Sequence, residues 1–160
     1  MDNREWFRQA KYGMMVHFGL YSLLGGEYRG RRTPSYAEWA QSYFAIPSKE
    51  YSALANNFNP VYFNADEWIS LAKDCGMQSF VFSSKHHDGF ALWPSRFTGY
   101  SVKNTPFGQD VVRLFVDACR QAEMKVGLYY SPAQWGKEQA EMTDEAYENY
   151  FIDQLSELLD

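Results

Sequence analysis

The sequence predicts an α/β fold with about three parallel strands and crossover helices, as in the first part of a (β/α)8 TIM-type barrel. Strand patterns alternate with helix patterns three times along the 160 residues. The strand candidates are short, continuous apolar runs, which are typical of strands buried on both faces. This alternation favours a parallel sheet whose strands are joined by helices.

The first expected strand covers residues 12–18, where an apolar run stands between Gly13 and His17. Residues 19–46 follow as a long stretch rich in Gly, Arg, Ser and Tyr, without a clear strand. A loop of that length inside a compact domain is usually functional. A helix is expected over residues 48–57, with an apolar stripe that consists of Tyr51, Leu54, Ala55 and Phe58.

A second helix is expected to begin at Asn64, which can cap it, and Glu67 completes a capping-box pair three residues later. Gly76 ends this helix as a residue in the left-handed conformation. The second strand is expected over residues 79–83 and leads into a segment that contains two histidines. The stripe that should face the core consists of Trp68, Leu71, Ala72 and Cys75.

The third helix is expected over residues 109–123 and the third strand over residues 125–130. Thr143 caps a last helix, whose acidic first turn suits the helix dipole. That helix runs to the end of the sequence, and no fourth strand follows it. Because a complete barrel needs eight strands and about 250 residues, we expect residues 1–160 to be the N-terminal part of a barrel domain, truncated before the fourth strand.

Composition and charge argue against several classes of protein. Hydrophobic residues make up 46% of the chain and aromatic residues 18%, which is typical of a folded domain. The net charge of -5 argues against a nucleic-acid partner. No apolar run reaches the roughly 20 residues of a membrane-spanning helix, and the first residues lack a signal peptide. The chain as given is expected to be cytoplasmic, although a chain trimmed of its leader would look the same.

The two cysteines, Cys75 and Cys119, both fall on the apolar faces of expected helices. We interpret them as small buried hydrophobic residues rather than as a disulfide or a metal site.

All three histidines of the chain, His17, His86 and His87, lie at the carboxyl ends of expected strands. Active sites of barrels and of open α/β sheets lie at that edge, so the pattern predicts one shared site. Adjacent strand residues point to opposite faces, so His86 and His87 converge only if the strand ends or bulges between them. With no Cys partner nearby, we expect no metal and no cofactor. Neutral imidazoles beside aromatic rings suit a ligand with several hydroxyl groups.

Templates for other chemistries do not match. The sequence has no G-x-x-x-x-G-K-[ST] phosphate loop and no G-x-G-x-x-G after a strand. It has no G-x-S-x-G nucleophile elbow either.

Five segments together resemble the retaining α-L-fucosidases among the glycoside hydrolases. Residues 12–19, Tyr-Gly-Met-Met-Val-His-Phe-Gly, resemble that family's opening strand, and Glu38-Trp39 its Glu-Trp pair. Asn59-Pro60 with residues 65–68 resembles the entry to its second helix. The most specific segment is 85–93, Lys-His-His-Asp-Gly-Phe-Ala-Leu-Trp, and residues 127–131 resemble the next strand. The resemblance covers nearly the whole chain, in order, with Phe18 and Gln109 standing where the family often has Trp and Arg.

The resemblance implies a role for each matching residue. His17, His86 and His87 are expected to hydrogen-bond fucose hydroxyls, Glu38 to accept a hydroxyl hydrogen bond beside Trp39, and Tyr129 to reach the same site. Phe90 is expected to contact the methyl group of the sugar. The substrate is then a fucosylated glycan or fucoside.

The resemblance also implies hydrolysis of α-L-fucosides with retention, which needs two carboxyl groups about 5–5.5 Å apart. Both are expected beyond residue 160, so this chain contains no catalytic residue and is expected to be inactive by itself. Unpaired sheet edges then favour self-association. Two alternatives remain: a non-catalytic module that binds fucose, and a metal-dependent α/β hydrolase.

Overall fold

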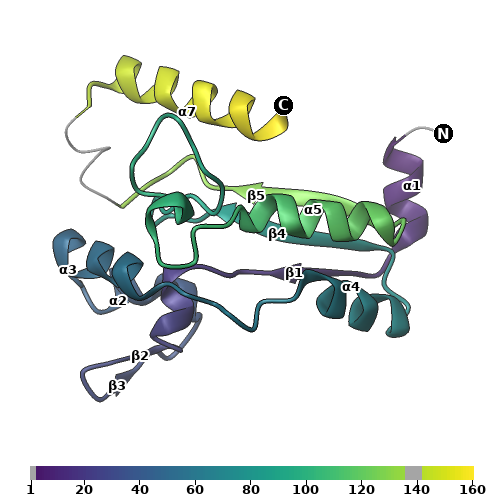
Figure 1. Cartoon of the computed structure of the whole chain (residues 1–160), viewed down its shortest axis with the longest axis horizontal. Helices are drawn as coiled ribbons and strands as arrows, with labels where there is room; N and C mark the ends of the chain where they lie inside the picture. The colour runs from purple at the N-terminus through teal and green to yellow at the C-terminus, as the bar shows by residue number, and fades with distance from the viewer. Residues whose placement is uncertain (1–2, 136–141) are drawn as a thin grey trace.

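The computed structural model describes residues 3–135 and 142–160. At its centre is a parallel sheet of three strands in the order β1 (Gly13–Val16), β4 (Ser79–Lys85) and β5 (Lys125–Tyr130). All three strands point the same way, so their carboxyl ends meet at one edge of the sheet (Figure 1). The predicted α/β class with three parallel strands is confirmed, and β5 has the predicted bounds.

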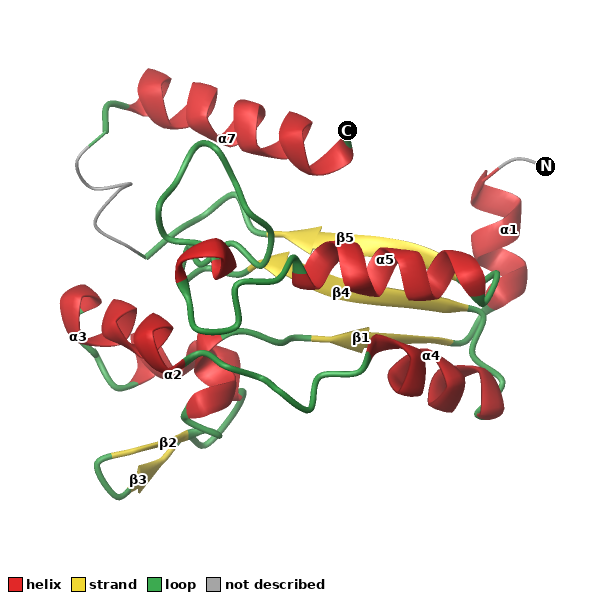
Figure 2. Ribbon diagram, in the orientation of Figure 1, coloured by secondary structure: helices red, strands yellow, loops and turns green. Residues whose placement is uncertain are grey.

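Helices α4 (Ala65–Asp74) and α5 (Val111–Gln121) pack against each other on one face of this sheet (Figure 2). Helix α1 (Asn3–Ala10), which we did not predict, lies at the amino-terminal end of the strands. Helix α7 (Asp144–Leu159) lies on the β5 side. Helices α4, α5 and α1 leave the carboxyl-terminal edge of the sheet to the loops, whereas α7 reaches that edge through Gln154, which accepts a hydrogen bond from Lys85 at the end of β4.

The long stretch after β1 consists of short elements rather than one irregular loop. A two-residue hairpin joins its strands through Arg29 and Gly30, which both adopt positive φ angles, and such a short hairpin leaves little periodic signal in a sequence. The helix predicted over residues 48–57 begins as an α-helix and continues as a 3₁₀-helix. The short elements between β1 and α4 are η1 (Leu20–Leu23), β2 (Glu27–Tyr28), β3 (Arg31–Arg32), η2 (Ala37–Trp39), α2 (Ala40–Tyr43), α3 (Ser48–Ser52) and η3 (Ala53–Asn57). A further one, η4 (Val102–Asn104), lies between β4 and α5.

Three helices begin at side-chain caps. The Asn64 side chain accepts from the Glu67 backbone N–H, so the predicted cap is confirmed, and Asn64 Nδ2 donates to the Glu67 carboxylate, which therefore pairs with the side chain of Asn64 and not with its backbone N–H as in a capping box. Thr143 caps α7 through the Ala146 N–H, as predicted. Helix α5 begins two residues later than predicted, because the Asp110 carboxylate caps it.

Aromatic rings hold the amino-terminal half of β4 against α5. Phe80 and Phe82 are fully buried on β4, and the Phe115 ring on α5 contacts both. The centroid of the Phe115 ring lies 4.8 Å from that of Phe80 and 4.5 Å from that of Phe82. These offset and edge-to-face contacts add to the burial of apolar area and fix α5 over the centre of the sheet.

The predicted apolar stripe of α4 was wrong in part. Cys75 is exposed and Leu71 is 59% exposed, whereas Ala65, Ile69 and Ala72 are buried. The helix is therefore rotated so that a neighbouring stripe, three and four residues apart, faces the sheet. Cys119 on α5 is buried as predicted.

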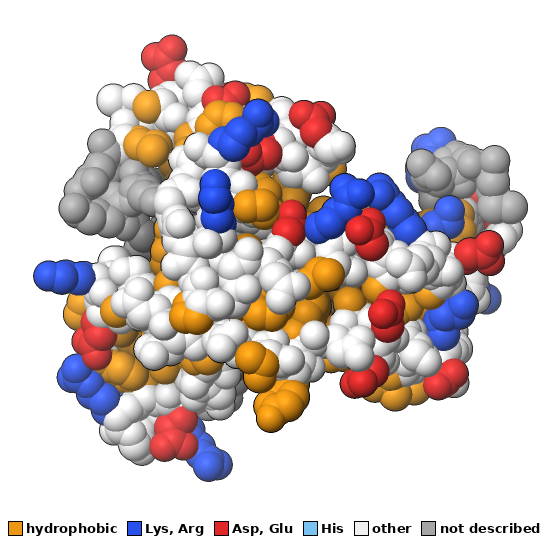
Figure 3. Space-filling view, in the orientation of Figure 1, with side chains coloured by type: hydrophobic (Ala, Val, Ile, Leu, Met, Phe, Trp, Pro, Cys, Tyr) orange, Lys and Arg blue, Asp and Glu red, His pale blue; other side chains and the backbone are white. Residues whose placement is uncertain are grey.

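Helix α7 buries a narrow part of its surface. Tyr150 and Gln154 are its buried residues, and the predicted stripe of Tyr147, Phe151, Leu155 and Leu158 is half-buried beside them. No helix in the described part of the chain is long and apolar enough to cross a membrane. Acidic and basic side chains are interspersed on the face shown in Figure 3.

Candidate functional site

The candidate site lies at the carboxyl-terminal edge of the sheet, and an irregularity in β4 forms it. Ser83 pairs with Tyr129 of β5, but the next pair is Lys85 with Tyr130, so β4 contains one extra residue at this point. The strand then ends at Lys85. Because the regular alternation stops here, the side chains of neighbouring residues are free to turn toward the same side.

The three imidazoles gather at this edge, as the sequence predicted. The ring centroid of His86 lies 4.8 Å from that of His17 and 4.8 Å from that of His87. The Tyr129 ring contacts His17 at 5.1 Å and stacks on His86 at 5.4 Å. We call His17, Glu38, Trp39, His86, His87 and Tyr129 the rim cluster.

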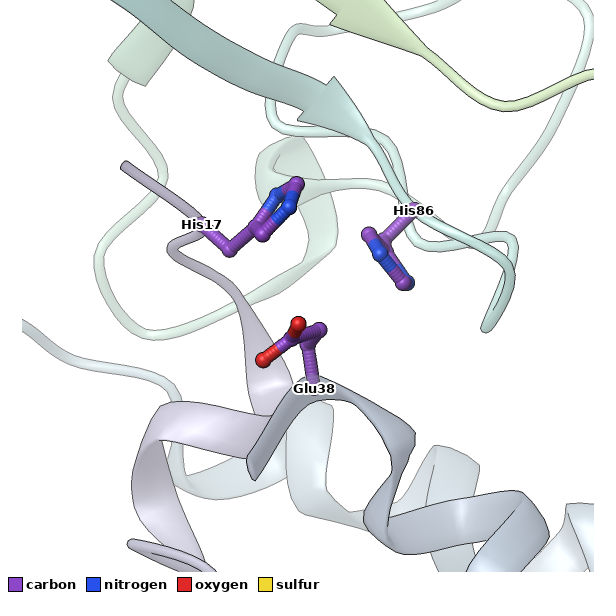
Figure 4. Close-up of side chains that lie close together, drawn as sticks. All are labelled: His17, Glu38 and His86. Carbon is purple, nitrogen blue, oxygen red and sulfur yellow. The ribbon is translucent and has the colours of Figure 1, made fainter. Parts of the chain in front are cut away.

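Glu38 and Trp39 reach the same place from η2, in the long stretch after β1. The ligand atoms of His17, Glu38 and His86 all lie within 4.8 Å of one another. Figure 4 shows these three side chains pointing toward one another from separate parts of the chain. The Trp39 ring, 45% exposed, contacts His87 at 5.4 Å between centroids. All six residues singled out in the sequence are therefore neighbours in space.

A hydrogen bond orients the His17 ring. Its Nδ1 lies 2.5 Å from Ser83 Oγ, and that hydroxyl also lies 3.4 Å from the Val16 carbonyl oxygen. With Nδ1 engaged by Ser83, Nε2 is the ring nitrogen left for a ligand. Burial lowers the pKa of His17, opposed by the nearby Glu38 carboxylate.

His86 is the most buried member of the rim cluster, at 4% exposure. Burial, followed by repulsion from His17 and His87, lowers the pKa of His86 to about 3. The imidazole is therefore neutral at neutral pH. Its Nδ1 is buried and has no hydrogen-bond partner among the described residues. Buried polar atoms in folded proteins almost always have a partner, so this one indicates a ligand.

His87 is oriented from the loop after β5. Its Nδ1 lies 2.9 Å from the Ala133 carbonyl and 2.6 Å from Ser131 Oγ. Ser131 Oγ itself donates to the same carbonyl at 2.8 Å, so Nδ1 of His87 is the protonated nitrogen. Both half-buried histidines, His17 and His87, therefore have Nδ1 engaged by the protein and Nε2 left for a ligand.

Asp88 stabilises the turn that follows the histidines of the rim cluster. The Tyr51 hydroxyl donates to its Oδ2 at 3.0 Å, and the Phe90 N–H donates to its Oδ1 at 3.1 Å. Burial raises the pKa of Asp88 to about 6. With both oxygens engaged inside the protein, Asp88 holds the turn that follows His87 and is not available to a ligand.

Lys85, next to His86, is 1% exposed and points toward α7. Its Nζ donates to Tyr130 OH and to Gln154 Oε1, both at 2.8 Å. The ammonium also lies 4.3 Å from the centroid of the Tyr130 ring. This lysine joins the end of β4 to α7 and is a structural residue.

The sequence did not indicate several neighbours of the rim cluster. The Trp135 ring lies 5.0 Å from His87 and 5.1 Å from Trp39. Tyr21, from η1, is buried with its ring 5.7 Å from His86. The position of Trp135 shortly after a strand end was the available signal, whereas Tyr21 carried none. Phe90, which we expected beside the sugar, is 2% exposed and packs against Phe58 and Tyr100 in the core.

Chemically, the rim cluster combines neutral imidazoles, one carboxylate and aromatic rings. Imidazoles can donate or accept hydrogen bonds, and a carboxylate accepts them. Such a set can bind a ligand with several hydroxyl groups and an apolar face.

Comparisons with known proteins point in one direction. The family model described as "Alpha-L-fucosidase" matches residues 1–160. The chain is 41% identical over 106 residues to "Alpha-L-fucosidase 1" of Arabidopsis thaliana, which covers 64% of this chain and 21% of that protein. It is 31% identical over 139 residues to the human "Plasma alpha-L-fucosidase", covering 81% of this chain and 30% of that protein. The chain thus spans less than a third of these two relatives.

Solved structures agree with the sequence comparisons. The α-L-fucosidase AlfC from Lactobacillus casei in complex with α-L-fucose product superposes with a TM-score of 0.91. It is 43% identical, and the match covers 99% of this chain and 57% of that one. A GH29 α-L-fucosidase from Bacteroides thetaiotaomicron, trapped as a covalent intermediate, superposes with a TM-score of 0.86 at 31% identity. That match covers 95% of this chain and 37% of that one.

Proposed function

The chain belongs to the α-L-fucosidase family, and on this premise we propose that its full-length parent hydrolyses terminal α-L-fucosides with retention. The observation that supports the proposal most directly is that three imidazoles converge with Glu38 and Tyr129 at one edge of the sheet. The Lactobacillus relative binds α-L-fucose, which supports a fucoside as the substrate.

Each member of the rim cluster has a proposed role in binding the sugar. The Nε2 atoms of His17 and His87 form hydrogen bonds with fucose hydroxyls, and Glu38 accepts another. His86 satisfies its unpaired Nδ1 through the sugar or a water that accompanies it. Trp39 and Tyr129 supply aromatic surface for the apolar face of the ring.

Retention requires a covalent glycosyl-enzyme formed by one carboxylate and an acid/base residue that is a second carboxylate. The Bacteroides relative forms a covalent intermediate, which supports this mechanism for the family. Among the described residues of the rim cluster, Glu38 is the one carboxylate, and the adjacent Asp88 is engaged by Tyr51 and Phe90. We therefore propose that the nucleophile and the acid/base lie outside these 160 residues and that this chain alone is inactive.

The three parallel strands are proposed to be the first strands of a (β/α)8 barrel, with residues 1–160 forming the N-terminal part of its domain. The solved relatives are longer, and this chain covers 57% of the Lactobacillus chain.

Strands β1 and β5 are the edge strands of the described sheet. Unpaired edges readily pair with another chain, so this chain alone is proposed to self-associate. A monomer that persists on dilution in light-scattering measurements would contradict self-association.

Hydrolysis of 4-nitrophenyl α-L-fucopyranoside by the longer protein tests the function. We expect His86→Ala and His87→Ala each to lower kcat/KM about 10- to 100-fold, because each leaves a hydrogen-bonding group of the sugar without a partner, worth about 1–3 kcal/mol. Tyr62→Ala is the control, because Tyr62 is 95% exposed and contacts none of the rim cluster's rings. Wild-type kcat/KM in both histidine variants would refute the assignment.

A further inference from the structure

His17, Glu38 and His86, which are proposed to bind the sugar, also have the ligand types of a metal site. They come from three separate places: the residue after β1, the 3₁₀-helix η2, and the residue after β4. Their ligand atoms lie within 4.8 Å of one another, and the three side chains lie close together (Figure 4). Because separate backbone segments hold these side chains, the fold brings the three donors together before any ligand binds.

Two imidazole nitrogens and one carboxylate oxygen are a donor set that zinc uses where it keeps an open fourth position. With bonds of about 2.0–2.2 Å, tetrahedral ligand atoms lie roughly 3.4 Å apart. The three donors therefore need to move inward by about 1 Å. Glu38 is half-buried on a short helical turn and has a flexible side chain, so a change of rotamer supplies that movement.

Two features of the histidines suit a bound ion. Metal-bound histidines usually hydrogen-bond an outer partner through their other ring nitrogen. His17 has such a partner, because its Nδ1 is engaged with Ser83 Oγ, which leaves Nε2 for the ion. His86 is 4% exposed, and its Nδ1 has no partner among the described residues, so that atom is available to an ion as well as to the sugar.

We propose that His17, Glu38 and His86 together bind one Zn²⁺ ion, and that zinc and a sugar exclude each other from this cluster. Zinc binding goes beyond the proposed function and does not depend on it, because the three donors suffice. Only the exclusion depends on sugar binding at the same place.

The test is calorimetric titration of ZnCl₂ into the metal-stripped 160-residue chain carrying Cys75→Ala, since the exposed Cys75 thiol could bind zinc by itself. We expect one Zn²⁺ per chain. Glu38→Gln, which keeps the shape of the side chain, should weaken binding by at least about tenfold, and His86→Ala should do the same. Circular dichroism checks that each variant is folded, and Glu38→Gln decides the matter if His86→Ala does not fold.

The matched control is His87→Ala, which removes an imidazole from the same edge but outside the three donors, and should retain zinc binding. Absence of stoichiometric binding, or binding that survives Glu38→Gln, would overturn the proposal. Equal loss in His87→Ala would overturn the choice of ligands.

L-fucose titrated separately, without metal, tests the sugar assignment, so that either proposal can fail while the other stands. If both ligands bind, zinc should raise the apparent Kd for fucose in proportion to its concentration, and unchanged fucose affinity would refute exclusion.

Discussion

Both halves of strand β4 contain fully buried side chains, but the two halves are built from opposite chemistry. In the first half, Phe80 and Phe82 are inaccessible to solvent and contact other aromatic rings. In the second half, Ser84 and Lys85 are just as inaccessible and are joined to their surroundings by hydrogen bonds. The first half stabilises the sheet by burying apolar surface. The hydrogen bonds of the second half instead fix the end of the strand, which positions His86 in the rim cluster.

Removing an aromatic ring from the apolar half should have the largest effect on stability. Phe82→Ala deletes a buried ring that contacts Phe115, Phe18 and Trp68, and we expect a loss of about 3–5 kcal/mol in the free energy of unfolding. Urea denaturation measures it. Phe82→Leu, which retains most of the apolar volume, should cost clearly less. Equal losses in the two variants would show that packing volume does not govern this half.

Removing a polar partner from the second half should cost less, but for a different reason. Gln154→Leu conserves volume, yet it takes away the acceptor shared by Lys85 Nζ and the Tyr130 hydroxyl. We expect a loss of about 1–3 kcal/mol, the cost of leaving buried donors with fewer acceptors. The same denaturation measurement checks it. Unchanged stability would mean that this half gains nothing from its satisfied hydrogen bonds.

Lowering the pH should weaken the packing of α7 beside the polar half of β4, and this is the smallest of the expected effects on stability. Glu157 on α7 accepts from Trp93 Nε1 and from the backbone and side chain of Arg96. Although burial opposes it, these hydrogen bonds hold the pKa of Glu157 below its usual value. A pKa that is lower in the folded state adds stability above the unfolded pKa, and that stability is lost as the pH falls through the folded value.

The Glu157→Gln substitution tests what the charge of this carboxylate contributes to stability. At pH 7 we expect it to cost about 1 kcal/mol, because the charged acceptor is lost and Arg96 is largely exposed. Wild type and variant should converge as the pH falls through the lowered pKa of Glu157, measured by urea denaturation at each pH. A difference that persists undiminished in acid would contradict the role of the carboxylate charge.

The apolar half of β4 was the easier part to predict. Continuous apolar runs and capping residues such as Asn64 and Thr143 gave elements close to those observed. The face of α4 was harder, because two overlapping stripes, one through Leu71 and one through Ile69, fit the same period. Only packing against the sheet and α5 selects between them. Helix α1 was missed although its apolar and polar residues lie on different sides, because its 8 residues are too few for the apolar period to repeat.

The rim cluster was predictable to the extent that strand ends determine it. Three histidines at strand ends had to share an edge once the strands were parallel. Glu38 and Trp39 came from family resemblance, since nothing in their spacing places η2 over the sheet. Trp135 and Tyr21 were missed because long-range packing, and not local pattern, brings loops to the site.

Because of the extra residue between Ser83 and Lys85, the alternation of side chains between the two faces of the sheet shifts by one residue at this point. In a regular strand of the same residues, Ser84 would pair with Tyr130, and every following side chain would lie on the opposite side of the sheet. The ammonium of Lys85 would then turn toward the ligand, and the imidazole of His86 toward helix α7. The recognition chemistry of this protein therefore depends on the bulge in β4 as much as on the kinds of residues that follow it.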